Sequence, residues 1–306
     1  MIRLRKKYLE LLIKKGIINI AFSGGESLLR SDLQELIIFT SSLKATSIQI
    51  SNNKLTKEKI TPNIFVISNG SLISNQFLDF CQEYKIRLSM SLPGISTYNE
   101  HTQFGTAKTI LHWFEEAKKR NILTTVNITV TKRNFFELYE TISLALISGA
   151  DSLLLNRFLP GGRGIENSEE LLLSIKEINE MLDIAEDILQ KSNRFGSVGT
   201  ELPKCILNRK DYKHLKVGTR CSAALDFFTI DPSGYIRACN HSENRLVHIS
   251  EFEKLKNNSI WKQFVMKDYK PIMCNNCEYI YDCDGGCREA ANICGGCINA
   301  KDPIFI

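Results

Sequence analysis

The stretch Ile17-Ile-Asn-Ile-Ala-Phe-Ser-Gly-Gly-Glu26 joins an apolar run to a glycine turn that ends in a carboxylate. The apolar run predicts a short buried strand. Gly24 and Gly25 allow backbone N–H groups to approach a ligand closely, and Glu26 offers an anionic acceptor for an ammonium group. An ordinary Gly-Gly turn with a surface Glu is the alternative interpretation. The turn is neither a P-loop nor a dinucleotide fingerprint, because the residues that define those motifs do not follow it.

Strands and helices are expected to alternate along the first half of the chain. Apolar spacing predicts a helix over residues 3–15 and another beginning near residue 31. Further strands are expected at 64–67, 87–92, 124–130 and 152–158, with helices at 75–84, 107–120 and 135–148. This order predicts parallel βα units in an α/β, TIM-barrel-like fold, whose site lies at the C-terminal ends of the strands.

The second half of the chain is expected to differ in character. A long amphipathic helix is expected over residues 168–190, with Ser168 as its N-cap. The periodic pattern breaks around residues 194–199, so we expect two domains, 1–195 and 196–306. In the second domain, residues 227–237 predict a hairpin whose turn is Asp231-Pro-Ser-Gly234.

Composition excludes several classes of protein. The 306 residues include 39 basic and 34 acidic ones, and the net charge of +5 is too small to predict a nucleic-acid partner. No run approaches the roughly 18 apolar residues of a membrane span, and no secretory signal is recognised. We therefore expect a cytoplasmic protein with no membrane or nucleic-acid partner. In that setting its cysteines are expected to bind metal rather than form disulfides.

Eight of the ten cysteines follow residue 220, at spacings typical of metal ligands. The pattern is C-x12-G-x4-C, then C-x2-C-x5-C-x3-C, with two more close behind. Eight thiolates suffice for two four-coordinate zinc sites or for two [4Fe–4S] clusters, so the spacing alone leaves both open. The eight are Cys221, Cys239, Cys274, Cys277, Cys283, Cys287, Cys294 and Cys297.

The motifs after successive strands resemble those of radical S-adenosylmethionine (SAM) enzymes. They are Gly24-Gly-Glu26, Ser68-Asn-Gly70, Ser89-Met-Ser-Leu-Pro-Gly94, Asn127 and Asn156-Arg-Phe-Leu-Pro-Gly-Gly-Arg-Gly164. The cysteine pattern is similar to the SPASM extension, which holds auxiliary [4Fe–4S] clusters in that family. The resemblance implies a partial (β/α)6 barrel with a C-terminal cysteine-rich SPASM domain. The tail is most similar to that of enzymes that mature ribosomally made peptides.

The resemblance also implies roles for particular residues. The amino group of SAM is expected on Gly24, Gly25 and Glu26. Its carboxylate and ribose are expected near Ser68, Asn69, Ser89, Ser91 and Asn127. One or two auxiliary clusters are expected: the first on Cys221, Cys239 and Cys287, with Cys205 to complete it, and the second on Cys274, Cys277 and Cys283, with Cys297 or else Cys294 to complete it.

One motif of the family has no counterpart in these residues. The C-x3-C-x2-C loop that binds the SAM-cleaving cluster is not found, and the one early cysteine, Cys81, is expected to be a core residue. We therefore expect an N-terminally truncated member that lacks the first strand, and we assign no catalytic residue. The alternatives are a non-catalytic cluster-bearing partner subunit and a zinc-stabilised binding module.

The expected partner is a ribosomally made peptide, with a complete paralogue or a leader-binding protein as a further one. Arg157 and Arg163, at the end of the last predicted barrel strand, are candidates to meet a carboxylate of substrate or SAM. Ordinary surface arginines are the alternative interpretation.

Overall fold

The computed structural model describes residues 2–51, 54–209 and 211–305. The strands of its main sheet are β1 (Asn19–Phe22), β4 (Asn63–Ser68), β5 (Arg87–Ser91), β6 (Thr124–Val130), β7 (Ser152–Arg157), β8 (Phe195–Val198) and β9 (Leu215–Lys216). They are ordered β1-β4-β5-β6-β7-β8-β9. The pairs β1–β4, β4–β5, β5–β6 and β8–β9 are parallel, which confirms the predicted α/β partial barrel.

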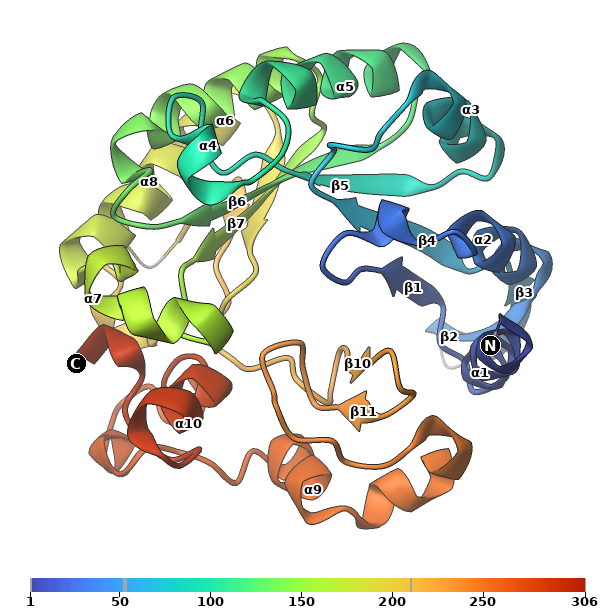
Figure 1. Cartoon of the computed structure of the whole chain (residues 1–306). Helices are drawn as coiled ribbons and strands as arrows, with labels where there is room; N and C mark the ends of the chain where they lie inside the picture. Colours follow the sequence, from blue (N-terminus) through green and yellow to red (C-terminus); the bar gives the residue numbers. More distant parts are fainter. Residues whose placement is uncertain (1, 52–53, 210, 306) are drawn as a thin grey trace. The chain divides into compact units, whose positions relative to one another are not determined.

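Helices connect the strands, as βα units require. They are α1 (Ile2–Lys14), α2 (Leu33–Ser42), α3 (Asn75–Glu83), α4 (Tyr98–His101), α5 (Ala107–Lys119), α6 (Leu138–Ile147), α7 (Ser168–Leu171), α8 (Ile175–Ser192), α9 (Ser259–Met266) and α10 (Arg288–Gly295). Figure 1 shows α2, α3 and α5 on the same face of β1, β4 and β5. This face is therefore the covered side of the sheet.

Alternation along the strands separates an apolar face from a polar one. Val66 of β4 and Met90 of β5 are fully buried, and Leu88 is almost so. Their neighbours Ser89 and Ser91 are only half-buried and point to the opposite face, because successive side chains of a strand alternate. The apolar side chains lie on the face covered by helices. The polar side chains on the opposite face are available to form a site.

The chain forms two compact units, which are described separately below. The first comprises residues 1–128 and 139–153, and the second comprises residues 129–138 and 154–306. The second unit contains the cysteine-rich part, where β10 (Thr229–Ile230) and β11 (Ile236–Arg237) form the predicted hairpin. The predicted domain boundary near residue 195 stays a prediction, although β8 begins at that position and is part of the sheet.

Three local features differ from the sequence expectation. The long helix begins at Ile175, not at Ser168, because Ser174 and Glu177 form a capping box there. The short strands β8 and β9 were not anticipated. Nor was the antiparallel hairpin of β2 (Ala45–Ser51) with β3 (Lys54–Ile60), since residues 56–59 are polar and exposed and leave no alternating apolar signal.

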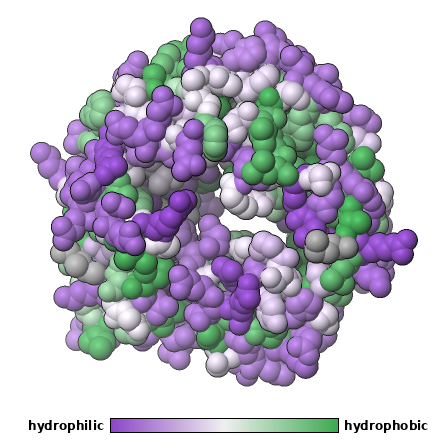
Figure 2. Space-filling view, viewed as in Figure 1, coloured by the Kyte–Doolittle hydropathy of each residue, from purple (hydrophilic) through white to green (hydrophobic). Residues whose placement is uncertain are grey.

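The surface is largely polar in the view of Figure 2, where hydrophobic residues occur in small separate groups. Within the described parts of the chain, no helix has both the length and the apolar character needed to span a membrane.

Candidate cofactor and metal sites

In the first unit, the glycine turn after β1 holds the Glu26 carboxylate in a fixed position. Its Oε1 accepts hydrogen bonds from Ser68 Oγ at 2.8 Å and Leu28 N at 3.0 Å, and its Oε2 accepts one from Asn69 N at 2.7 Å. A carboxylate has about four acceptor positions. One position on Oε2 therefore stays available for an ammonium group.

The surroundings of this carboxylate leave room for a ligand. A Cβ atom added at Gly24 or Gly25 would meet no atom within 4 Å, so the turn faces open space. Gly24 has φ +151°, which disfavours other residues. Gly70, after β4, has φ +78°, and a Cβ there would also lie 2.5 Å from Ile110 Cδ1. The turn is thus open, and the next strand end is tightly packed.

Ser68 and Asn69 have a supporting role in this geometry. Ser68 donates to Glu26 and accepts a hydrogen bond from Gly70 N at 2.9 Å. The side chain of Asn69 accepts one from Ser71 N at 2.9 Å. The sequence expectation placed both residues against SAM itself, and that stays a prediction. What the structure shows is that they hold Glu26 and the turn after β4.

Polar groups of β5 and β6 gather on the face of the sheet away from the helices. Ser91 and Asn127 are register partners on these strands. The hydroxyl of Ser89 is buried and has no hydrogen-bond partner within the described residues. Because a buried polar group without a partner is costly, Ser89 fits a position where a ligand supplies the missing bond.

In the second unit, four cysteines from distant parts of the chain line one cavity. Cys205 comes from a 3₁₀ turn (Lys204–Ile206), and Cys274 ends another (Ile272–Cys274). With Cys277 and Cys283 they face the same space, together with Pro203, Tyr279 and Phe305. Backbone N–H groups point at the sulfurs: Gly285 N donates to Cys283 Sγ at 3.2 Å, and Tyr279 N lies 3.5 Å from Cys277 Sγ.

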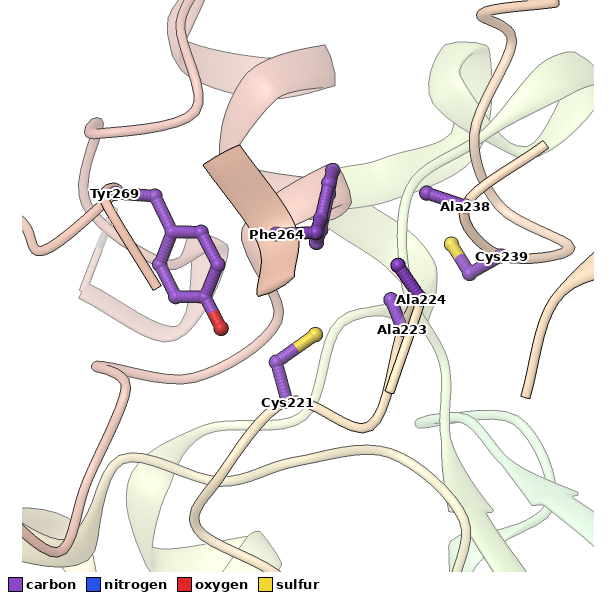
Figure 3. Close-up of a cluster of buried hydrophobic side chains, with 7 residues drawn as sticks. All are labelled: Cys221, Ala223, Ala224, Ala238, Cys239, Phe264 and Tyr269. Atoms are coloured by element: carbon purple, nitrogen blue, oxygen red, sulfur yellow. The ribbon is translucent and has the colours of Figure 1, made fainter. Parts of the chain in front are cut away.

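A second group of thiols is more deeply buried. Cys221, Cys239 and Cys287 are 5–7% exposed. Burial raises the pKa of both Cys239 and Cys287 to about 12, and the Cys287 thiol contributes to the raised pKa of Cys239. Figure 3 shows Cys221 and Cys239 in one apolar cluster with Ala223, Ala224 and Phe264.

The donor sets suit iron–sulfur chemistry. In the described part of the chain, no three His, Cys, Asp or Glu side chains are arranged to hold a single metal ion. A [4Fe–4S] cluster binds four thiolates through four different irons, so its ligands surround a cage and not one point. Four thiols around a common cavity, with N–H groups directed at sulfur, fit such a group.

A buried carboxylate fixes the loops that carry these thiols. Asp284 is fully buried and accepts hydrogen bonds from Cys221 N at 2.8 Å and from Tyr269 Oη at 3.2 Å. Burial alone would raise the pKa of Asp284, but the ammonium groups of Lys267 and Lys270 lower it, so the side chain is anionic. This network joins the Cys221 loop to the C-x5-C-x3-C segment.

The comparisons agree with this geometry. Residues 3–145 match the family model of the radical SAM superfamily. Among curated proteins, the chain is 24% identical to the PqqA peptide cyclase of Bradyrhizobium diazoefficiens, over 97% of this chain and 76% of that protein. It is also 24% identical to the AdoMet-dependent heme synthase of Oleidesulfovibrio alaskensis, over 93% of this chain and 74% of that protein.

Solved structures show the same fold. The structure of anSMEcpe with bound AdoMet and the Cp18Cys peptide has a TM-score of 0.66 at 18% identity, covering 92% of this chain and 81% of that one. Streptococcus suis SuiB bound to its precursor peptide SuiA has a TM-score of 0.64 at 13% identity, covering 99% and 68%. The partial-barrel fold is therefore shared with these two proteins.

Some predicted site residues lie where the radical SAM resemblance did not put them. Cys205 was expected with the first thiol group, whereas the structure places it in the cavity of the second. Cys294 and Cys297 are exposed, as is Cys205, but they are not among the residues that line that cavity. Cys81 is fully buried in α3, which confirms it as a core residue.

Arg157 is buried and not a surface residue. It is 2% exposed and pairs with Asp302, so the interpretation as a surface arginine was wrong, and contact with a carboxylate of substrate or SAM stays a prediction. Arg163 is exposed, in the 3₁₀ turn Gly162–Asn167. Sequence reasoning missed Asp284 and Asp302 altogether. In the sequence, Asp284 is marked only by its position next to Cys283, and Asp302 only by its position near the chain end. Neither position predicts a buried carboxylate.

Proposed function

We propose that this chain is a radical SAM/SPASM peptide-modifying protein, which binds auxiliary [4Fe–4S] clusters on its two groups of thiols and SAM at the turn after β1. The observation that carries the proposal is the cavity lined by Cys205, Cys274, Cys277 and Cys283. Similarity to a PqqA peptide cyclase, and to structures of anSMEcpe and SuiB with peptides, supports a peptide as the substrate.

Different residues would bind the two kinds of cofactor. Glu26 would accept the ammonium group of SAM through Oε2, and Ser89, Ser91 and Asn127 would meet its polar groups from the strand face. The thiolates of the second unit would hold the auxiliary clusters, which supply one-electron chemistry when bound. Asp284 and its lysines keep the ligand loops together in the absence of metal.

A second cavity in the same unit is a candidate peptide site. It has a volume of about 260 Å³ and lies beyond the ends of β8 and β9. Its lining combines both charges, Lys216 and Arg220 against Asp226 and Glu201, with the aromatic ring of Phe227. Ser222 also lines it, next to the ligand candidate Cys221, and donates through its backbone N–H to Glu201 at 3.2 Å. A peptide held here would lie beside the first thiol group.

Metal analysis of the full chain tests this proposal. Protein purified without oxygen should be brown and absorb light at about 400 nm. It should contain iron and acid-labile sulfide in equal amounts. Colourless protein that contains only zinc would contradict the assignment, since zinc bound by four cysteines adds neither colour nor sulfide.

Peptide binding is tested separately. The probe is the product of a short open reading frame beside the gene, titrated into the iron-loaded protein. Micromolar binding that is weakened at least tenfold by Phe227→Ala would support the peptide site, whereas equal binding by the variant would remove that cavity from the proposal.

A further inference from the structure

Cys205 lies apart in sequence from the cysteine pattern but beside it in space. It is in the 3₁₀ turn Lys204–Ile206, and it shares a cavity with Cys274, Cys277 and Cys283. The turn is fixed to this group, because Lys204 N donates a hydrogen bond to Cys283 Sγ at 3.3 Å. The residue before Cys205 thus contacts a sulfur of the set, which directs Cys205 to the same space.

Two cations contact the backbone of the segment that carries Cys283. Lys270 Nζ contacts the backbone oxygen of Cys283 and lies 2.7 Å from that of Ile280. Arg288 is fully buried, and backbone carbonyls accept its hydrogen bonds, at 3.0 Å for Ala300 and 3.2 Å for Gly286. Lys270 is paired with Asp284, so these contacts fix the segment next to the cavity.

The downstream cysteines differ from Cys205 in position and not in exposure. Cys294, in α10, and Cys297, which follows that helix, are exposed, as Cys205 also is. Neither residue is among those that line the cavity.

We propose that Cys205 is the fourth ligand of a [4Fe–4S] cluster on Cys274, Cys277 and Cys283, and that Cys294 and Cys297 are not ligands of this cluster. The inference rests on the proposed function, because it assumes that the cavity holds a cluster. The sequence expectation took all four ligands of this cluster from residues 274–297. With Cys205 as the fourth ligand, the cluster instead joins the turn after β8 to the C-terminal segment.

Serine substitutions in the full chain test the assignment. Wild type, Cys205→Ser, Cys274→Ser, Cys294→Ser and Cys297→Ser are reconstituted without oxygen, and iron, sulfide and the low-temperature EPR spectrum after dithionite reduction are compared. Cys205→Ser and Cys274→Ser should show the same change, a loss of up to about four irons per chain or conversion of one cluster signal. Cys294→Ser and Cys297→Ser should match wild type.

Alkylation of the wild-type protein measures which cysteines iron protects. Because no residue is substituted, a folding defect of a variant does not affect the result. Iodoacetamide is added before and after iron is removed with a chelator, and the labelled cysteines are identified by mass spectrometry. Cys205 should be protected only while iron is bound, whereas Cys297 should be labelled in both states. Cys294 serves as a second exposed comparison.

The outcomes separate the inference from the proposed function. Cys205→Ser with wild-type iron and spectrum, or loss of a cluster in Cys297→Ser or Cys294→Ser, would overturn the inference while leaving the clusters in place. An unchanged Cys274→Ser protein would overturn the cluster site itself, and with it the proposed function.

Discussion

Arg157 and Asp302 form a two-point ion pair inside the second unit, with N···O distances of 2.8 and 2.6 Å. The pair joins the end of β7 to the C-terminal segment, and both side chains are almost fully buried. Asp302 also accepts a hydrogen bond from Cys287 N at 2.8 Å, and Arg157 donates one to the backbone oxygen of Glu201 at 3.1 Å. One ion pair therefore helps to position Cys287, a candidate cluster ligand.

Removing one charge of this pair should be costly. Asp302→Asn leaves the guanidinium of Arg157 buried without an anion, so we expect a loss of about 3–5 kcal/mol in the free energy of unfolding, measured by urea denaturation. Asp187→Asn is the control, because its ion pair with Lys191 is exposed on α8 and is worth about 0.5 kcal/mol or less. Equal losses in the two variants would contradict the prediction.

Glu26 should determine the affinity for SAM. Glu26→Gln keeps the size of the side chain and removes the charge that faces an ammonium group, so we expect about tenfold or greater weakening of SAM binding by calorimetry. Glu35→Gln is the matched control, since Glu35 is an exposed residue that pairs with Lys6 on the outer helices. Unchanged affinity in Glu26→Gln would separate the turn from SAM binding.

Glu186 should make the second unit sensitive to acid. Its carboxylate accepts hydrogen bonds from the N–H groups of Lys213 at 2.8 Å and Leu215 at 2.9 Å. Burial would raise its pKa, but these backbone bonds lower it below the ordinary value of 4.5. A carboxyl whose pKa is lower in the folded state stabilises the fold fully above the unfolded value and loses this effect as pH falls through the folded value.

We therefore expect Glu186→Gln to lower the free energy of unfolding by about 2 kcal/mol at pH 7. The difference from wild type should stay constant down to about pH 4.5 and shrink below it. Glu180→Gln, on the exposed side of the same helix, should show no such trend. A difference for Glu186→Gln that does not vary with pH would assign the effect to packing.

SAM cleavage should require cluster ligands that these 306 residues do not offer as the expected motif. They contain no C-x3-C-x2-C spacing, which holds the SAM-cleaving cluster in the family that the chain resembles. We expect no 5′-deoxyadenosine after anaerobic reconstitution, reduction and incubation with SAM, measured by chromatography against an active radical SAM enzyme as positive control. Stoichiometric release of the product would show that other residues supply those ligands.

Much of the fold was accessible from the sequence. The strands β1, β4, β5, β6 and β7 were expected, because buried parallel strands read as apolar runs between amphipathic helices. Strands β8 and β9 were missed, since four and two residues are too short to carry a period. The hairpin β10–β11 was found through its turn chemistry and not through its strands.

The sites divide in the same way. The spacing of the cysteines alone indicated metal ligands, and the Gly-Gly-Glu turn after an apolar run indicated a ligand site at a strand end, because both signals are local in the chain. Only the tertiary structure placed Cys205 with Cys274, buried Arg157 against Asp302, and surrounded Asp284 with two lysines. The residues in those contacts are 14 to 145 positions apart in the sequence. Such pairs depend on how the whole unit packs, and a local sequence pattern does not predict them.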